Sequence, residues 1–145
     1  MRVKQIFFIA LIIFTANTLA ESKTGSLAVT FAGFSSTEGK LAIAIWNSKD
    51  VFLSKNKAPF RSANLTIILP TTEWVIDNLP YGKYAISVYQ DENNNNDLDT
   101  NFFGVPKEPY GFSNNVQGSF GPPSYEQASF IVGPTNAVIK IKLVQ

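Results

Sequence analysis

Residues 79–88 read Leu79-Pro80-Tyr81-Gly82-Lys83-Tyr84-Ala85-Ile86-Ser87-Val88, a turn that leads directly into a β-forming run. Pro80 and Gly82 are typical turn residues, and the residues that follow favour a pleated, half-buried strand. In sandwich folds, a tyrosine early in such a strand packs its ring inward and hydrogen-bonds the preceding backbone, an arrangement called the tyrosine corner. The stretch therefore predicts a sandwich strand in which Tyr84 is structural and not catalytic.

Similar runs lie on both sides of this one. Apolar residues alternate with polar ones, and Gly, Pro and Asn separate the runs. The predicted strands cover 27–31, 41–45, 65–69, 74–76, 84–89, 128–132 and 137–144. Alternation is expected where one face of a sheet meets the core and the other meets water. We expect an all-β, seven-stranded antiparallel β-sandwich, Ig-like or prealbumin-like, with one long ordered loop.

The first twenty residues have the features of a signal peptide. Arg2 and Lys4 are basic, the segment 6–15 is almost wholly apolar but too short to span a bilayer, and Thr18 and Ala20 put small residues at the cleavage site. We predict removal of residues 1–20, a single domain over 21–145, and no stable membrane insertion afterwards.

Composition excludes several classes of function. The chain has no Cys and no His, which rules out a Ser-His-Asp triad, a thiol nucleophile and a His-ligated zinc ion. Without Arg2 and Lys4, ten basic residues face eleven acidic ones, so nothing favours nucleic acid as a partner. We predict a protein that is not an enzyme and has no catalytic residues.

A metal-binding pattern follows the central strand, where residues 91–99 read Asp-Glu-Asn-Asn-Asn-Asn-Asp-Leu-Asp. Oxygen-bearing side chains recur at every second position, as in a loop that wraps Ca²⁺. The clustered carboxylates also repel one another unless a cation neutralises them. The predicted ligands are Asp91, Asn93, Asn95, Asp97 and Asp99, with Glu108 as a candidate to complete the set.

Two positions depart from the usual calcium loop. Asn96 stands where Gly normally makes the sharp turn, although Asn tolerates the left-handed conformation. Phe102 stands where a bidentate Glu would lie, so we expect weak affinity, roughly 10⁻⁴–10⁻³ M. The alternative interpretation is a solvated Asn- and Asp-rich turn without metal.

The long stretch 91–125 contains four prolines and six aromatic residues. So many aromatics argue against disorder, and a loop of this length in a compact domain is usually functional. Its aromatic and amide side chains could form a binding surface for a protein or a glycan. The candidate residues are Tyr110, Phe112, Asn114 and Asn115. Alternatively, the rings fold back over the sheet and only cover it.

Three motifs together carry a resemblance to a known family. They are Gly82-Lys83-Tyr84, then Asp91-x-Asn93-x-Asn95-x-x-Leu98-Asp99, then Gly104-x-Pro106-x-Glu108-x-Tyr110-Gly111-Phe112-Ser113-Asn114-Asn115. The chain resembles an uncharacterised group of exported bacterial proteins, the domain of unknown function number 2141. The resemblance implies a small β-sandwich that is periplasmic or secreted, with no established activity. Residues 79–88 are also similar to prealbumin-like sandwiches, and the Asp-x-Asn-x-Asn pattern is similar to calcium loops of some adhesin modules.

We therefore expect an exported, non-catalytic module. A weak Ca²⁺ site would order the long loop 91–125, and this loop would contact a partner. The alternative is a carbohydrate-recognition accessory domain that uses Tyr110, Phe112 and Trp46 or Trp74.

Overall fold

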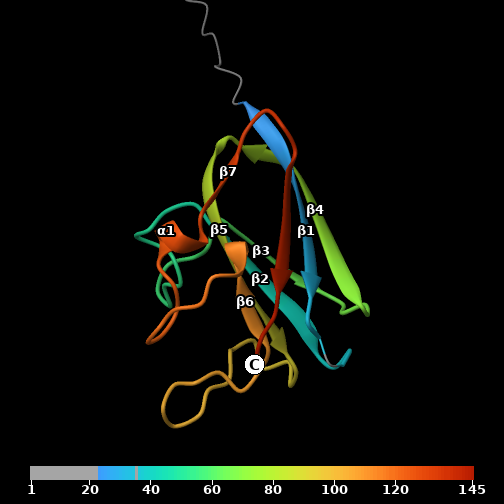
Figure 1. Cartoon of the computed structure of the whole chain (residues 1–145), viewed down its shortest axis with the longest axis vertical. Coiled ribbons are helices and arrows are strands. Elements are labelled where there is room, and N and C mark those ends of the chain that lie inside the picture. Colours follow the sequence, from blue (N-terminus) through green and yellow to red (C-terminus); the bar gives the residue numbers. More distant parts are fainter. Residues whose placement is uncertain (1–22, 35) are drawn as a thin grey trace, which may run out of the picture.

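The computed structural model describes residues 23–34 and 36–145, which form two β-sheets packed face to face (Figure 1). The predicted signal peptide, 1–20, lies outside the described residues. The elements are β1 (Thr24–Ala32), β2 (Lys40–Trp46), β3 (Arg61–Leu65), β4 (Thr71–Pro80), β5 (Gly82–Asp91), β6 (Tyr110–Phe112), η1 (Ser113–Asn115), α1 (Tyr125–Ala128), β7 (Phe130–Val132) and β8 (Ala137–Lys142).

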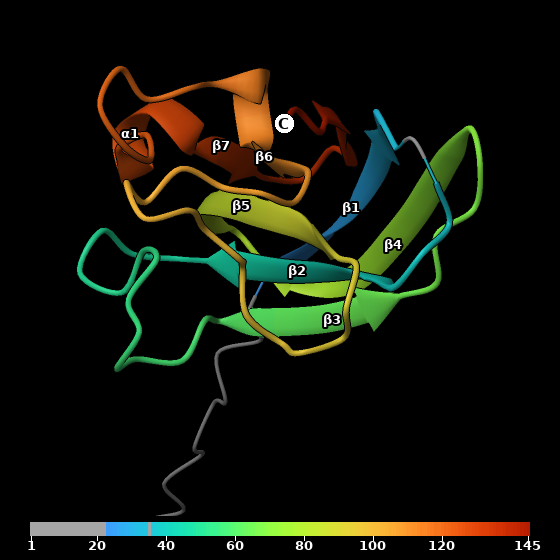
Figure 2. The same cartoon turned by 90° about the horizontal axis from the view of Figure 1, so that it is seen from below.

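The sandwich consists of a three-stranded sheet in the order β4-β1-β8 and a second sheet in the order β3-β2-β5-β6, with β7 also paired to β5 (Figure 2). The predicted sandwich is thus confirmed. The strand predicted at 65–69 lies instead at 61–65 (β3), and the topology differs in two details. The structure has eight strands, because the short β6 joins the second sheet, and β1 pairs with β8 in parallel. A parallel pair needs a long crossover, and almost the whole domain lies between these two strands.

The core lies between the sheets and follows the alternation predicted from the sequence. Its fully buried residues include Leu27 and Phe31 of β1, Ile45 of β2 and Ile86 of β5. From β8 and its C-terminal extension, Ile141 and Leu143 also point inward. Burial of these apolar side chains supplies the main driving force for folding.

Tyr84 forms the predicted tyrosine corner. Its ring is buried, and its hydroxyl donates a hydrogen bond of 2.8 Å to the carbonyl oxygen of Pro80. The ring also packs against Phe60 at a centroid distance of 5.5 Å. Burial raises the pKa of the Tyr84 hydroxyl, and the nearby Arg61 partly offsets this rise. The corner therefore fixes the start of β5 against the turn that precedes it.

The substitution Tyr84→Phe should lower the free energy of unfolding by about 1 kcal/mol, because it removes this hydrogen bond and leaves the Pro80 carbonyl without its donor. Urea unfolding measures the change. The matched control is Tyr81→Phe, at a half-exposed ring whose hydroxyl makes no hydrogen bond to the described residues. Equal stability of the two variants would show that the corner is not needed.

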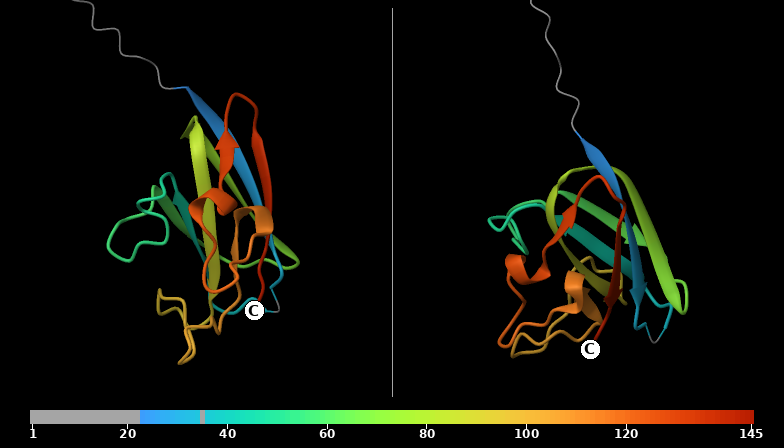
Figure 3. Two further views of the ribbon diagram at one scale, coloured as in Figure 1. Left: turned by 60° about the vertical axis from the view of Figure 1, so that its left-hand side comes forward. Right: turned by 45° about the horizontal axis from the view of Figure 1, so that its top comes forward.

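A second apolar cluster covers the outer face of β5. It contains Trp46, Ala85, Phe112, Tyr125 and Ala128. Phe52, from the turn after β2, packs against the Tyr125 ring at a centroid distance of 5.7 Å. Figure 3 shows α1 and η1 lying over this side of β5. Both faces of β5 are therefore covered. The segment from β6 to α1 is ordered because its side chains pack on the outer face of this strand.

Candidate functional site

The loop 91–99 leaves the end of β5 and is organised around Asp91. This side chain is fully buried, and its two carboxylate oxygens accept hydrogen bonds from the backbone N–H groups of Asn95 at 3.0 Å and Asn96 at 2.9 Å. The Lys40 ammonium lies 3.2 Å from the same carboxylate and also donates to the Asn96 side chain. The Asp91 carboxylate thus holds the turn together, and the Lys40 ammonium neutralises the charge of this carboxylate.

The electrostatics of this contact hold Asp91 in its charged form. Burial alone raises the pKa of a carboxyl group. At Asp91, the Asn96 N–H, the Lys40 ammonium and the Asn95 N–H together outweigh burial and hold the pKa below its ordinary value. Two residues before Asp91 on β5, burial and then the charges of Asp91, Asp97 and Glu108 raise the pKa of Tyr89 to about 12.

Asn93 and Asn95 bond both the backbone of the loop and the side chain of Asp99. The Asn93 side-chain oxygen accepts from the Asn95 N–H at 3.0 Å, and the Asn95 side-chain oxygen accepts from the Asp97 N–H at 2.8 Å. The amide nitrogens of both residues donate to the Asp99 carboxylate, at 2.6 and 3.3 Å. The predicted ligands Asp91, Asn93, Asn95 and Asp99 thus belong to one hydrogen-bonded loop. The Asp97 side chain is exposed and, among the described residues, accepts only from the adjacent Leu98 N–H, at 3.1 Å.

Glu108 connects this loop to the strand that follows it. Its side chain is buried, and its two oxygens accept from the backbone N–H groups of Glu92 and Asp99, each at 2.9 Å. Because Glu92 begins the loop and Asp99 ends it, Glu108 closes the loop at its base. Both of its oxygens accept backbone N–H groups, as those of Asp91 do, so Glu108 ties the two ends of the loop together.

One backbone feature of the loop 91–99 agrees with a calcium-binding loop. Asn96 has a φ of 65°, the left-handed conformation expected at the sharp turn of such a loop. However, no three His, Cys, Asp or Glu side chains among the described residues gather closely enough to hold a metal. A cation here would depend on amide and carbonyl oxygens, which Ca²⁺ accepts, and would compete with Lys40 for Asp91.

Beyond Asp99 the chain forms a hairpin, residues 99–107, whose tip is apolar. Thr100 and Pro106 pair as an isolated bridge, and Lys107 donates its N–H to the Asp99 carbonyl. Asn101 folds the tip. Its backbone N–H donates to Val105, its carbonyl accepts from Gly104, and its side-chain oxygen accepts from the N–H groups of Phe103 and Val105.

Three apolar side chains of this hairpin tip project into solvent. The exposed fraction is 97% for Phe102, 85% for Phe103 and 56% for Val105. The two rings meet edge to face at a centroid distance of 5.5 Å. Figure 1 shows this loop extending from the end of the sandwich where the C-terminus lies. Large exposed apolar groups that are held together in this way are typical of interaction surfaces.

The predicted aromatic surface is arranged differently from the expectation. Phe112 is buried in the second apolar cluster and Tyr110 packs against it at a centroid distance of 6.1 Å, so the Phe112 ring folds back over the sheet, which is the alternative that the sequence left open. Phe112 points inward because β6 has joined the sheet. Asn114 donates to the carbonyls of Gln127 and Ser129, which ties η1 to α1.

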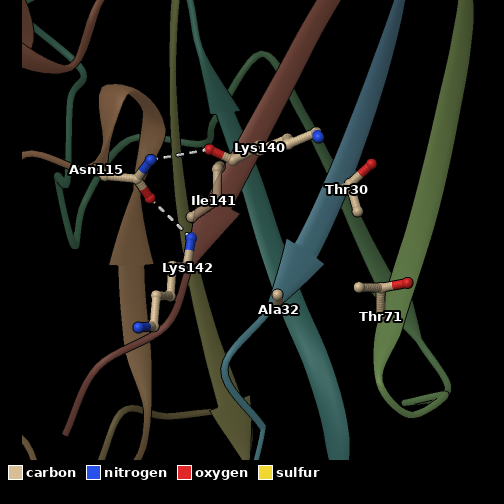
Figure 4. Close-up of a pocket in the computed structure, with 7 residues that line it drawn as sticks. All are labelled: Thr30, Ala32, Thr71, Asn115, Lys140, Ile141 and Lys142. Carbon is tan, nitrogen blue, oxygen red and sulfur yellow. Dashed lines mark hydrogen bonds between the residues drawn. The ribbon is translucent and has the colours of Figure 1, made fainter.

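Asn115 supports the free edge of β8. Its side chain donates to the Lys140 carbonyl at 3.1 Å and accepts from the Lys142 N–H at 2.7 Å. These bonds border a shallow groove of about 320 Å³ that also includes Thr30 and Thr71 (Figure 4). In Figure 4 the side chains of Lys140 and Lys142 point in opposite directions, so they do not converge on one position.

Two important residues were missed by reasoning from the sequence. Lys40 opens β2 and meets Asp91 only because β2 and β5 pair in that register, and nothing local to either residue indicates this pairing. Asn101 carried a detectable signal, because asparagine two residues before a turn often bonds the backbone ahead of it.

Comparisons with known proteins place the chain in a family without a known activity. No curated protein matches it. Among solved structures, a pilus-presented adhesin (Cpa) matches over 86% of this chain and 27% of its own length, with 14% identity and a TM-score of 0.38. The chain thus spans about a quarter of that adhesin. No helix among the described residues is both long enough and apolar enough to cross a membrane.

A family model described as "Uncharacterized protein conserved in bacteria (DUF2141)" matches residues 29–140. This match covers most of the sandwich and includes the polar loop, the hairpin and Glu108. The chain therefore belongs to the DUF2141 family of bacterial proteins.

Proposed function

We propose that the protein is an exported, non-catalytic binding module that contacts its partner through the hairpin tip, residues 100–106. The observation that carries this proposal is the exposure of Phe102, Phe103 and Val105 on a loop whose backbone is held by Asn101. A loop that is ordered before binding loses less conformational entropy on contact than a flexible one. The buried Glu108 and Asp91 serve this purpose by fixing the base of the hairpin.

Photo-crosslinking in bacterial cells that make the protein tests the proposal. p-Benzoylphenylalanine in place of Val105 should give a specific adduct on illumination, whether the partner is a protein or a lipid. The matched control carries the same group in place of Lys55, an exposed residue on a different loop. The proposal fails if the Val105 position gives no adduct beyond that of the Lys55 position.

A glycan partner has less support from the geometry. Of the aromatic residues that the sequence put forward for sugar stacking, Trp46 and Phe112 are buried. Phe102 and Phe103 meet edge to face, so they do not form one flat platform of the kind on which a sugar ring stacks.

We further propose that the loop 91–99 binds Ca²⁺ weakly, supported by the spacing of its oxygen-bearing side chains and by the left-handed backbone at Asn96. At a free concentration 100 times Kd, binding should stabilise the protein by about 2.7 kcal/mol, which corresponds to roughly 5 °C or more in Tm. Melting curves in EDTA, in 10 mM Ca²⁺ and in 10 mM Mg²⁺ measure this shift.

Two variants make the calcium experiment specific. Asp99→Ala should remove the shift, whereas Glu92→Ala should retain it, because Glu92 joins the hydrogen bonds of the described residues through its backbone N–H and not through its carboxylate. An unchanged Tm of the natural protein at 10 mM Ca²⁺ would refute the metal site. It would leave the binding role of the hairpin tip untouched.

A further inference from the structure

We infer that the partner of the hairpin tip is a lipid bilayer, which Phe102 and Phe103 enter to the depth of the interfacial region in a reversible, peripheral contact. This inference rests on the proposed function and names the chemistry of its partner. It is carried by three features of residues 100–106: their apolar exposure, their lack of charge and the internal pairing of their backbone.

The tip combines exposed apolar area with neutrality. Phe102, Phe103 and Val105 are its most exposed apolar side chains, and no residue from 100 to 106 carries a charge. The nearest charged residues, Asp99 and Lys107, stand at the two sides of the base. Transfer of apolar groups from water to hydrocarbon is favourable, whereas transfer of a charge is costly. The uncharged tip can therefore enter the bilayer, and the charged residues at its base prevent deeper insertion.

Four of the backbone N–H groups of the tip are paired within the loop. The N–H groups of Asn101, Phe103, Gly104 and Val105 all donate to acceptors inside residues 101–105. Hydrocarbon offers no hydrogen-bond partners, so a segment enters it at low cost only when its polar backbone is satisfied internally. A protein partner, in contrast, commonly bonds the backbone of a loop that it recognises. The pairing by Asn101 thus favours lipid over protein.

The charge at the base predicts which lipids are preferred. Asp97 is exposed, Asp99 is half-buried and Lys107 is exposed. These three side chains beside the tip carry a net negative charge, so an anionic surface repels the loop more than a zwitterionic one does. We expect binding to vesicles of phosphatidylcholine and phosphatidylethanolamine, weakened when phosphatidylglycerol replaces part of the mixture at low ionic strength.

Sedimentation of the full-length mature protein with these zwitterionic vesicles tests the inference. The double variant Phe102→Ser/Phe103→Ser should lower the partition coefficient at least tenfold. The matched control, Ile68→Ser/Leu69→Ser, also removes two exposed apolar side chains, but from the loop between β3 and β4, and should bind as the natural protein does. Equal binding by the two double variants would overturn the inference.

Fluorescence gives a second, independent readout of depth. The emission of Phe103→Trp should shift to the blue with vesicles and should be quenched by brominated acyl chains, whereas that of Ile68→Trp should not change. An unchanged Phe103→Trp spectrum at millimolar lipid would overturn the inference. If crosslinking at Val105 then yields a protein adduct, the binding role survives and only its lipid partner is refuted; if it yields no adduct, both proposals fail.

Discussion

Replacement of Asp91 by alanine is expected to lower the free energy of unfolding by about 3–5 kcal/mol, the range found when one partner of a buried ion pair is removed. The carboxylate is fully buried and holds the N–H groups of Asn95 and Asn96 together with the Lys40 ammonium. All three donors lose their acceptor in the variant. Urea unfolding at pH 7 measures the loss.

The pH dependence of this effect has a defined sign. Because the pKa of Asp91 is lower in the folded protein than its ordinary value, its stabilising effect is complete above the unfolded pKa of about 4. The effect is lost as the pH falls through the lower, folded pKa. The stability difference between the natural protein and Asp91→Asn should therefore be constant from pH 7 to 5 and shrink below pH 4. A difference that grows on acidification would contradict the assigned role.

The second large effect is expected for Glu108→Ala, which should lower the free energy of unfolding by about 2–6 kcal/mol, since two partly buried N–H groups lose their acceptor at about 1–3 kcal/mol each. These groups belong to Glu92 and Asp99, at the two ends of the polar loop. The variant should also loosen the hairpin tip, because the base no longer holds it. Thermal and urea unfolding measure the loss of stability.

Two further variants separate the role of Glu108 from a general effect of lost charge. Glu108→Gln keeps one acceptor oxygen, so only one of the two backbone N–H groups loses its acceptor. This variant should therefore lower the free energy of unfolding by about half as much. Glu92→Ala removes a nearby carboxylate but keeps the backbone N–H that Glu108 accepts, and it should have little effect. Equal destabilisation by Glu92→Ala and Glu108→Ala would contradict the assignment.

The sequence predicted those features that depend on local chemistry. Alternation located the inward-facing residues of β1 and β2, the Pro and Gly turn located the Tyr84 corner, and the tolerance of Asn for left-handed backbone predicted the conformation of Asn96. Each of these follows from a few neighbouring residues and therefore needs no knowledge of the tertiary structure.

Features that depend on strand pairing could not be predicted. The contact between Lys40 and Asp91 requires the register of β2 on β5, and the burial of Phe112 requires β6 to join the sheet. In place of the strand predicted at 65–69, the structure has β3 at Arg61–Leu65. Ser62 and Asn64 of this strand point to solvent, so its sequence has a weak apolar pattern. The loop after it buries Ile67 without being a strand.

The sharpest test of the account is amide hydrogen exchange across residues 92–108, measured by NMR in EDTA at neutral pH. If the loop is ordered from within by Asp91, Glu108 and Asn101, the amides of Asn96, Asp99 and Val105 should be protected in the natural protein. Protection of Asp99 should then fall sharply in Glu108→Ala. Exchange of all three amides at the rate of an unstructured peptide in the natural protein would contradict the account, because a hairpin that is not held at its base cannot present a preformed tip.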